Sequence, residues 1–130
     1  MSIRPDGRPH VTPLPTVGDA GALHFCPGAG EQKAKNLYRN PNCAITTGTA
    51  DADAGLDVVV EGTATRVTDP DRPTTLAALW KSRHNWDLHS ADGAFTGDEG
   101  NEALVFAVTP AKVLAFGQGE PYSQTRYRFA

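Results

Sequence analysis

Residues Glu31–Pro41 read EQKAKNLYRNP and directly follow the glycine-bearing turn Cys26–Gly30, CPGAG. This pattern predicts a short basic helix that ends before the proline, because a residue preceding proline is disfavoured in helical conformation. A helix start offers unpaired backbone N–H groups and a partial positive charge. Lys33 and Lys35 therefore make this helix start a candidate phosphate anchor. The alternative is an ordinary surface helix whose lysines are only solvated.

The periodicity of this helix separates its side chains into an inner face and two borders. At about 100° per residue, one face is apolar and should pack inward: Ala34, Leu37 and Tyr38. Lys33 lies on the border next to the preceding turn, whereas Lys35 lies on the opposite border and points toward solvent. The geometry therefore favours Lys33 as the residue that reaches a ligand bound at the turn.

The composition is that of an ordinary globular chain. Of its 130 residues, 39% are hydrophobic and 21% are charged, and the net charge is −3. These values predict a single domain, residues 1–130, with no overall attraction for nucleic acid or anionic membranes. No apolar run reaches the roughly 20 residues that a membrane-spanning helix needs, and no signal segment opens the chain. We therefore expect a cytoplasmic protein.

The cysteines and histidines do not form a recognisable metal-binding motif. Cys26 and Cys43 are far apart, and the four histidines lack the spacing of paired ligands. We expect no metal site and two reduced, partly buried thiols, with a disulfide as the alternative.

Two segments carry the clearest strand signals. Within Ile3–Leu14, Asp6 followed by Gly7 predicts a hairpin, because both central positions of such a turn favour positive φ. The longest expected strand is Asp57–Thr68, DVVVEGTATRVT. Gly62 in its middle predicts a bend of the strand, with a bulge or a close backbone approach as alternatives.

The remaining chain alternates short elements with Gly and Pro turns. Thr74–Arg83 has the apolar spacing of a second helix, and His84–Glu102 is expected to be a long polar loop that is functional or mobile. A break at Thr109–Pro110 separates two of the later strands. The further strands are expected at Leu23–Cys26, Cys43–Thr49, Ala103–Val108, Lys112–Phe116 and Ser123–Phe129. This pattern predicts a mainly β (α+β) fold, a small antiparallel barrel with helices that plug or flank it.

Six segments in a fixed order carry a family resemblance: DGRPHVTPL, LHF, KAKNLYRNP, VVVEGTATRV, VFAVTPAKVLAF and TRYRF. Together they resemble the pyridoxamine 5′-phosphate oxidase-like family, whose members are split-barrel proteins that bind FMN or the deazaflavin F420. The resemblance implies a six- to seven-stranded antiparallel split barrel with two or more short helices. It also implies a homodimer that holds its cofactors between the subunits. Family members usually have a helix and a full first strand before the hairpin, and we expect most of both to be absent here.

The resemblance also implies which residues contact the cofactor. Lys33 matches the family's phosphate-binding lysine, and Lys35 a second basic position. Thr12 and Pro13 match the strand beneath the flavin ring. The implied cofactor-binding set is Thr12, Pro13, Cys26, Lys33, Lys35, Asn36 and Arg126. The chain departs from the family where a serine and an arginine often precede the lysine, because it has Glu31 and Gln32 there.

The function implied by the resemblance is hydride transfer to or from an unidentified small molecule, with FMN as cofactor. An F420-dependent reductase is the alternative within the same class. A non-catalytic protein that binds a cofactor, haem or bilin is the alternative of another class. No catalytic triad or carboxylate pair is evident in the sequence, which is compatible with chemistry supplied by a cofactor. Catalytic residues are not identified, and Glu31 adds a negative charge where a phosphate is expected.

Overall fold

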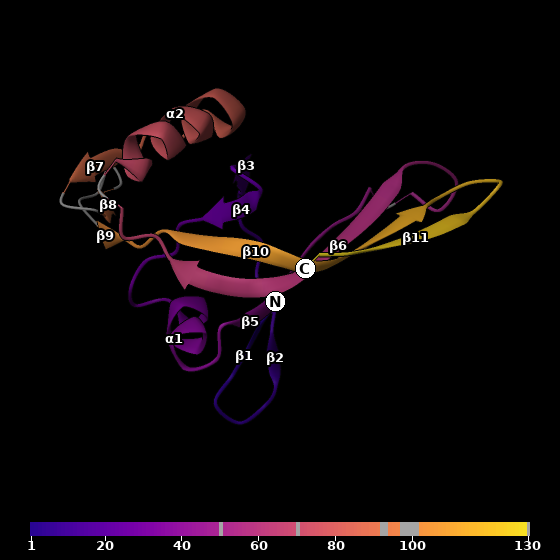
Figure 1. The fold of residues 1–130 in the computed structure, drawn as a ribbon, viewed down its shortest axis with the longest axis horizontal. Coiled ribbons are helices and arrows are strands. Elements are labelled where there is room, and N and C mark those ends of the chain that lie inside the picture. Colours follow the sequence, from indigo (N-terminus) through magenta and orange to yellow (C-terminus); the bar gives the residue numbers. More distant parts are fainter. Residues whose placement is uncertain (50, 70, 92–93, 97–101, 130) are drawn as a thin grey trace.

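The computed structural model describes residues 1–49, 51–69, 71–91, 94–96 and 102–129 (Figure 1). In these residues the helices are α1 (Gln32–Arg39) and α2 (Arg72–His84). The strands are β1 (Ser2–Ile3), β2 (Pro9–His10), β3 (Val17–Asp19), β4 (Ala22–Phe25), β5 (Asn42–Thr47), β6 (Leu56–Arg66), β7 (His89–Ala91), β8 (Ala94–Thr96), β9 (Glu102–Ala103), β10 (Phe106–Gly117) and β11 (Ser123–Arg128). The fold is mainly β and antiparallel, as predicted.

The central sheet has the strand order β3-β4-β10-β6-β5, and β11 also pairs with β10. Along one edge, β10 pairs with β6 from Phe106 to Gly117. Along its other edge, β10 pairs first with β4, up to Val108, and then with β11, from Lys112 onward. The sequence predicted two strands interrupted at Thr109–Pro110. That prediction was wrong, because the proline lies at a bulge that a single strand accommodates.

Gly62 lies opposite this bulge, where β6 and β10 approach closely. A Cβ atom at position 62 would lie 2.3 Å from the backbone oxygen of Thr109. The close backbone approach, one of the alternatives open for this glycine, is therefore what the structure shows, with the register shift on β10.

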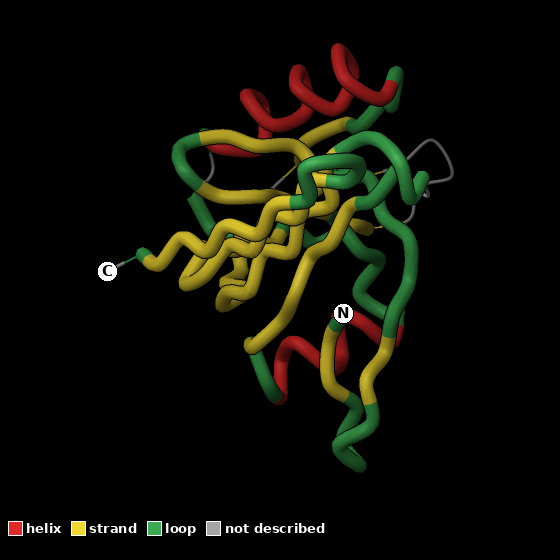
Figure 2. Tube along the Cα trace, turned by 90° about the vertical axis from the view of Figure 1, so that its right-hand side faces the viewer, coloured by secondary structure: helices red, strands yellow, loops and turns green. Residues whose placement is uncertain are grey.

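The two helices lie on opposite sides of the sheet, and each contributes to a separate hydrophobic cluster (Figures 1 and 2). Leu37 of α1 packs in the first cluster with residues of β4, β6 and β10: Phe25, Ala64, Phe106 and Val108, together with Leu104. Leu76 and Trp80 of α2 pack in the second, with Val17, Phe95 and Val105. Both predicted helices are thus confirmed as core elements.

Helix α1 buries Ala34 and Leu37 as its periodicity predicts, but the prediction for Tyr38 was wrong. The side chain of Tyr38 is 62% exposed. Its ring meets Phe106 edge-on with 6.2 Å between centroids, and its hydroxyl accepts a hydrogen bond from Arg66. The phenol therefore covers the core from outside while its polar end stays accessible to solvent.

The segment His84–Glu102 is not a plain loop, so that prediction also was wrong for its described part. Strands β7 and β8 pair with each other, and β8 pairs with β9. Phe95 on β8 is fully buried and contacts Trp80 edge-on. A single buried aromatic in a polar stretch anchors this small sheet, and residues 92–93 and 97–101 of the predicted loop lie outside the described residues.

The N-terminal hairpin is confirmed, since β1 pairs with β2. The expectation of positive φ at both turn positions holds for Gly7, at 86°, but not for Asp6. Met1 continues β1 onto the edge of β5, where its carbonyl accepts from the Ala44 N–H at 3.0 Å. Neither of the described helices is long and apolar enough to cross a membrane.

Candidate cofactor-binding site

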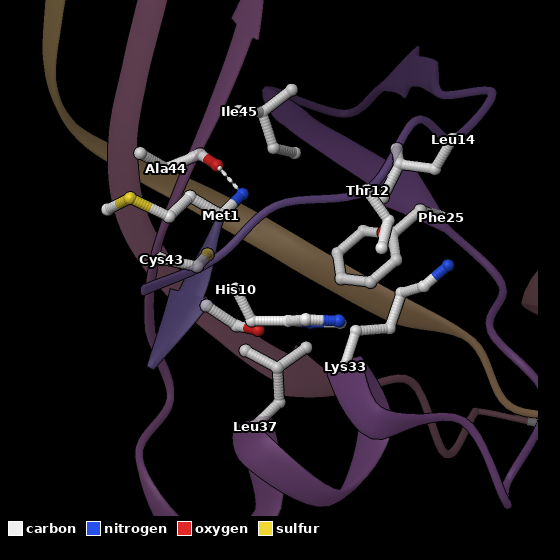
Figure 3. Close-up of a pocket in the computed structure, with 11 residues that line it drawn as sticks. Met1, His10, Thr12, Leu14, Phe25, Lys33, Leu37, Cys43, Ala44 and Ile45 are labelled. Carbon is white, nitrogen blue, oxygen red and sulfur yellow. Dashed lines mark hydrogen bonds between the residues drawn. The ribbon is translucent and has the colours of Figure 1, made fainter. Parts of the chain in front are cut away.

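A groove runs between α1, the extended segment after β2 and the edge strand β5 (Figure 3). Its narrow end encloses a volume of about 30 Å³ and includes Lys33 and His10 among its lining residues. Its wide end has a volume of about 400 Å³ and is lined mainly by two stretches, Val11–Leu14 and Ala44–Thr47. The two ends share five residues, Met1, Thr12, Leu14, Ala44 and Ile45. The two ends therefore adjoin each other, and together they are called the groove.

The wide end borders backbone groups at the edge of β5. Ala44 directs its N–H and C=O away from β6, because both bond to Met1. Successive residues of a strand point their hydrogen-bonding groups to opposite edges. The N–H and C=O of Thr46 therefore point to the same outer edge as those of Ala44. This edge offers a backbone donor and acceptor beside the groove.

Lys33 reaches the narrow end from the first turn of α1, and its side chain is 15% exposed. Its Nζ lies 2.7 Å from Oε2 of Glu31. The other carboxylate oxygen of Glu31 accepts a hydrogen bond from the Gly28 N–H at 2.8 Å. Burial opposes ionisation of Glu31, but the hydrogen bonds from Lys33 and Gly28 outweigh the effect of burial and lower the pKa of Glu31. The unexpected glutamate thus holds both the turn and the lysine in place.

The other predicted site residues divide into two groups. Thr12 and Pro13 line the wide end, beside Lys33 in the same groove. Lys35 is exposed and is not among the groove-lining residues, in agreement with the helix geometry. Arg126 lies on β11, opposite Leu114 of β10, where it also is exposed.

Asn36 is fully buried beneath the groove rather than at its surface. Its Oδ1 accepts from Gln32 at 2.7 Å, and its Nδ2 donates to the Ser2 hydroxyl at 3.0 Å. Both ends of the amide are engaged, so in this structure it ties β1 to α1. Its role here is to position the hairpin that carries the groove wall.

Cys26 faces a second hollow of about 700 Å³ on the other side of the turn. Burial raises the pKa of its thiol to about 12, with a smaller contribution from the charge of Glu31. Asp87 and Glu102 also line this hollow. The surroundings are acidic, so the larger hollow is less suited to a phosphate than the smaller end at Lys33.

His10 is a groove residue that the sequence analysis missed. It lies on β2, and its ring nitrogens lie next to the stem of Lys33 (Figure 3). A signal was present in DGRPHVTPL, because positions 10 and 12 of an extended segment share a face. Among the described residues, no group of three or more His, Cys, Asp or Glu side chains is arranged to hold a metal ion.

An antiparallel split barrel with a groove along its edge strand defines a class of proteins, and comparison with known families identifies which one. The family model of pyridoxamine 5′-phosphate oxidase matches residues 1–117. The chain belongs to this family. Comparison of the sequence with curated proteins gives no match.

Solved structures with the same fold include several cofactor-binding proteins. A pyridoxamine 5′-phosphate oxidase-related, FMN-binding protein from Nostoc punctiforme aligns with a TM-score of 0.71 and 16% identity, covering 99% of this chain and 78% of that one. An F420 reductase aligns at 0.63 with 23% identity, covering 86% and 83%. A heme-binding protein from Mycobacterium smegmatis aligns at 0.64 with 17% identity, covering 95% of this chain and half, 50%, of that one. Because these sequence identities are low, the similarity to the three structures shows a shared fold.

Proposed function

We propose that this protein binds FMN in the groove and acts as an oxidoreductase on a small molecule. The observation that carries the proposal is the shape and chemistry of the groove. Its narrow end has a lysine, and its wide end has an apolar wall and a strand edge. A flavin has the matching parts, an anionic phosphate and a flat ring with hydrogen-bonding edges. When bound, the flavin supplies hydride transfer.

The chain's own residues would hold and orient this cofactor. Lys33 would bind the phosphate with a charge-assisted hydrogen bond, and its bond to Glu31 fixes the lysine in advance. The outer edge of β5 at Thr46 would offer the ring edge a donor and an acceptor. Leu14 and Phe25 line the groove and would exclude water from the bound ring.

F420 is the alternative cofactor, supported by the F420 reductase among the structures of this fold. The replacement of the family's serine and arginine by Glu31 and Gln32 removes two phosphate donors. A site with fewer phosphate contacts would be weaker for FMN, or would suit a ligand with a longer tail. The preference for FMN or F420 would therefore depend on how many phosphate contacts the turn before α1 can make.

A non-catalytic binding protein is the proposal of a different class. The heme-binding protein from Mycobacterium smegmatis has the same fold, and haem requires an axial ligand such as histidine. Within the part of the chain that the structure describes, His10 is the histidine that lines the groove. An absorbance spectrum of the purified protein separates these readings, since flavin, deazaflavin and haem absorb differently.

We further propose a homodimer in which a second copy covers the groove. All six residues of β11 are exposed, and Arg126 lies on this strand. In a dimer, the partner's Arg126 would add a positive charge to the groove from outside. The mass of the protein in solution tests the dimer, and the cytoplasmic location stays a prediction.

The binding test compares two lysines of the same helix. Lys33→Ala should weaken FMN binding by about 1.5–3 kcal/mol, since it removes a charged hydrogen bond to phosphate. Lys35→Ala is the matched control, because this lysine is exposed outside the groove. Fluorescence titration gives both dissociation constants. An equal loss in the two variants, or no binding of FMN or F420 by the unaltered protein, contradicts the proposal.

Oxidoreductase activity is tested separately from cofactor binding. Under anaerobic conditions, an organic acceptor should reoxidise the reduced cofactor faster when the cofactor is bound to the protein than when it is free. Binding without any such acceleration over a broad set of acceptors would favour the non-catalytic protein instead.

A further inference from the structure

His10 has a polar atom that nothing in the described structure satisfies. Its Nδ1 is enclosed and has no hydrogen-bond partner among the described residues. A buried ring nitrogen without a partner is unfavourable, and such atoms in native proteins usually have a ligand, a water or a catalytic role. The ring also lines the narrow end of the groove together with Lys33, so a group bound there would contact the imidazole. Nδ1 is closed to solvent in this structure and would have to turn toward such a group.

The charged groups around His10 are cationic. They come from three elements: Arg4 from the turn of the hairpin, Lys33 from α1 and the amine of Met1 before β1. From β5, Cys43 lines the same end, and burial raises the pKa of its thiol, so it stays uncharged. Among the described residues, no carboxylate lines the narrow end, since Glu31 contacts Lys33 but is not a lining residue.

This environment disfavours a positive charge on the His10 imidazole when no ligand is bound. Desolvation, followed by the charges of Arg4, Lys33 and the Met1 amine, lowers the pKa of His10 below its usual value. The lowered pKa favours the neutral imidazole at pH 7 when no ligand is present. An anion at the narrow end would offset these positive charges and give the imidazole a hydrogen-bond acceptor.

We propose that His10 is a second phosphate-binding residue beside Lys33, and that it takes up a proton from solvent when the cofactor phosphate binds. The inference rests on the proposed function, since it concerns the same groove. The imidazolium would donate to the phosphate from β2 while Lys33 donates from α1. This arrangement replaces donors that the family usually places at the helix start, where this chain has Glu31 and Gln32.

The first experiment measures FMN affinity from pH 5.5 to 8 for the unaltered protein, His10→Gln and His89→Gln. Protonation of the FMN phosphate, with a second pKa of about 6, affects all three proteins alike. The effect of phosphate protonation therefore cancels in the ratio of the His10→Gln dissociation constant to that of the unaltered protein. The ratio should rise as the pH falls, up to about tenfold for each unit by which binding raises the pKa of His10. His89, on β7 across the sheet, is the control and should leave the ratio near one.

The second experiment follows the His10 imidazole directly by NMR, with its signals assigned from the His10→Gln spectrum or by labelling. Its pKa should lie below about 6.5 without ligand and rise by about one unit or more with FMN. If FMN binds and the His10 pKa does not rise, this inference is overturned while the proposed function stands.

The NMR signals of His10 also test the inference if the cofactor does not bind. Failure of both FMN and F420 to bind would remove the proposed function. Inorganic phosphate then serves as the probe, and a rise in the pKa of His10 on adding phosphate would still support an anion site. No response of His10 to phosphate would overturn the inference as well. These NMR measurements use the unaltered chain, so they do not depend on folding of the variant.

Discussion

The molecule has two regions that differ in how their apolar side chains are covered. The body contains both helices and both hydrophobic clusters, with Trp80, Phe95 and Val105 fully buried. The arm consists of residues 56–61 of β6, residues 112–117 of β10, and β11, and in Figure 1 it extends away from the helices. In the arm no residue of β11 is buried, and Tyr127 is 54% exposed.

This difference indicates that the two regions are stabilised in different ways. The body is stabilised mainly by its two buried apolar clusters, since hydrophobic burial is the main favourable contribution to folding. The arm relies on the hydrogen bonds of its strand ladders, and its exposed aromatic side chains are available to a second chain. Substitutions in the body should therefore affect unfolding, whereas substitutions in the arm should affect association.

Trp80→Ala should have the largest effect, a loss of about 3–5 kcal/mol in the free energy of unfolding. Trp80 is fully buried, meets Phe95 edge-on at 5.8 Å and donates to the Pro15 carbonyl. Urea denaturation measures the loss. Trp86→Ala is the matched control, because Trp86 is 40% exposed and should change stability far less. Equal effects of the two substitutions would contradict the assignment of the core.

Gly62→Ala tests the junction between body and arm. A Cβ here would meet the Thr109 backbone oxygen at 2.3 Å, so β6 and β10 would have to separate. We expect a loss of about 1–3 kcal/mol, as for other overpacked sites. Gly30→Ala is the control, since a Cβ there meets nothing within 4 Å. Thermal unfolding that is unchanged in Gly62→Ala would show that the strands at the bulge can move apart freely.

Mild acid should destabilise the body through His24. This residue is 2% exposed, and desolvation, followed by the charge of Arg72, lowers its pKa. The unfolded chain then binds more protons than the folded one, so stability is full above about pH 6.5 and falls as the pH decreases. Melting temperatures between pH 7 and 5.5 measure this, above the range where carboxylates titrate. His24→Asn should reduce the slope of this profile, and His10, whose pKa is also lowered, contributes to the slope that remains. An unchanged slope in His24→Asn would contradict the prediction.

Tyr127→Thr in the arm should have the smallest effect on unfolding, within about 0.5 kcal/mol for an exposed position. Threonine keeps the strand preference of tyrosine while removing its ring. If a second chain covers the arm, the substitution should shift the protein toward monomer at micromolar concentration. Sedimentation analysis reads this shift. A large loss of stability in the monomer would instead assign Tyr127 a role in the body.

The sequence predicted the elements whose signals are local. The hairpin followed from Asp6 and Gly7, and the inner face of α1 followed from the spacing of Ala34 and Leu37. The errors concern features that depend on distant neighbours. Proline at 110 indicated a break, but a bulge opposite Gly62 lets β10 continue.

The candidate site was predictable to a similar extent. Helix periodicity distinguished Lys33 from Lys35, and the structure places only the former among the groove-lining residues. The pairing of Glu31 with Lys33, and the burial of Asn36 against Ser2, depend on how the turn and the hairpin fold back. The role of Arg126 depends on a second chain and stays a prediction.

The position of β10 between β4 and β6 has a consequence for synthesis of the protein. This central strand is made late, after the segment that separates it from β6. At roughly 5–20 residues per second, a ribosome needs several seconds to pass from Arg66 to Phe106. During that time β4 and β6 lack their shared neighbour, and an unpaired strand edge can pair with other chains. The newly made chain is therefore exposed to such pairing until β10 emerges, and a chaperone acting in that interval would limit it.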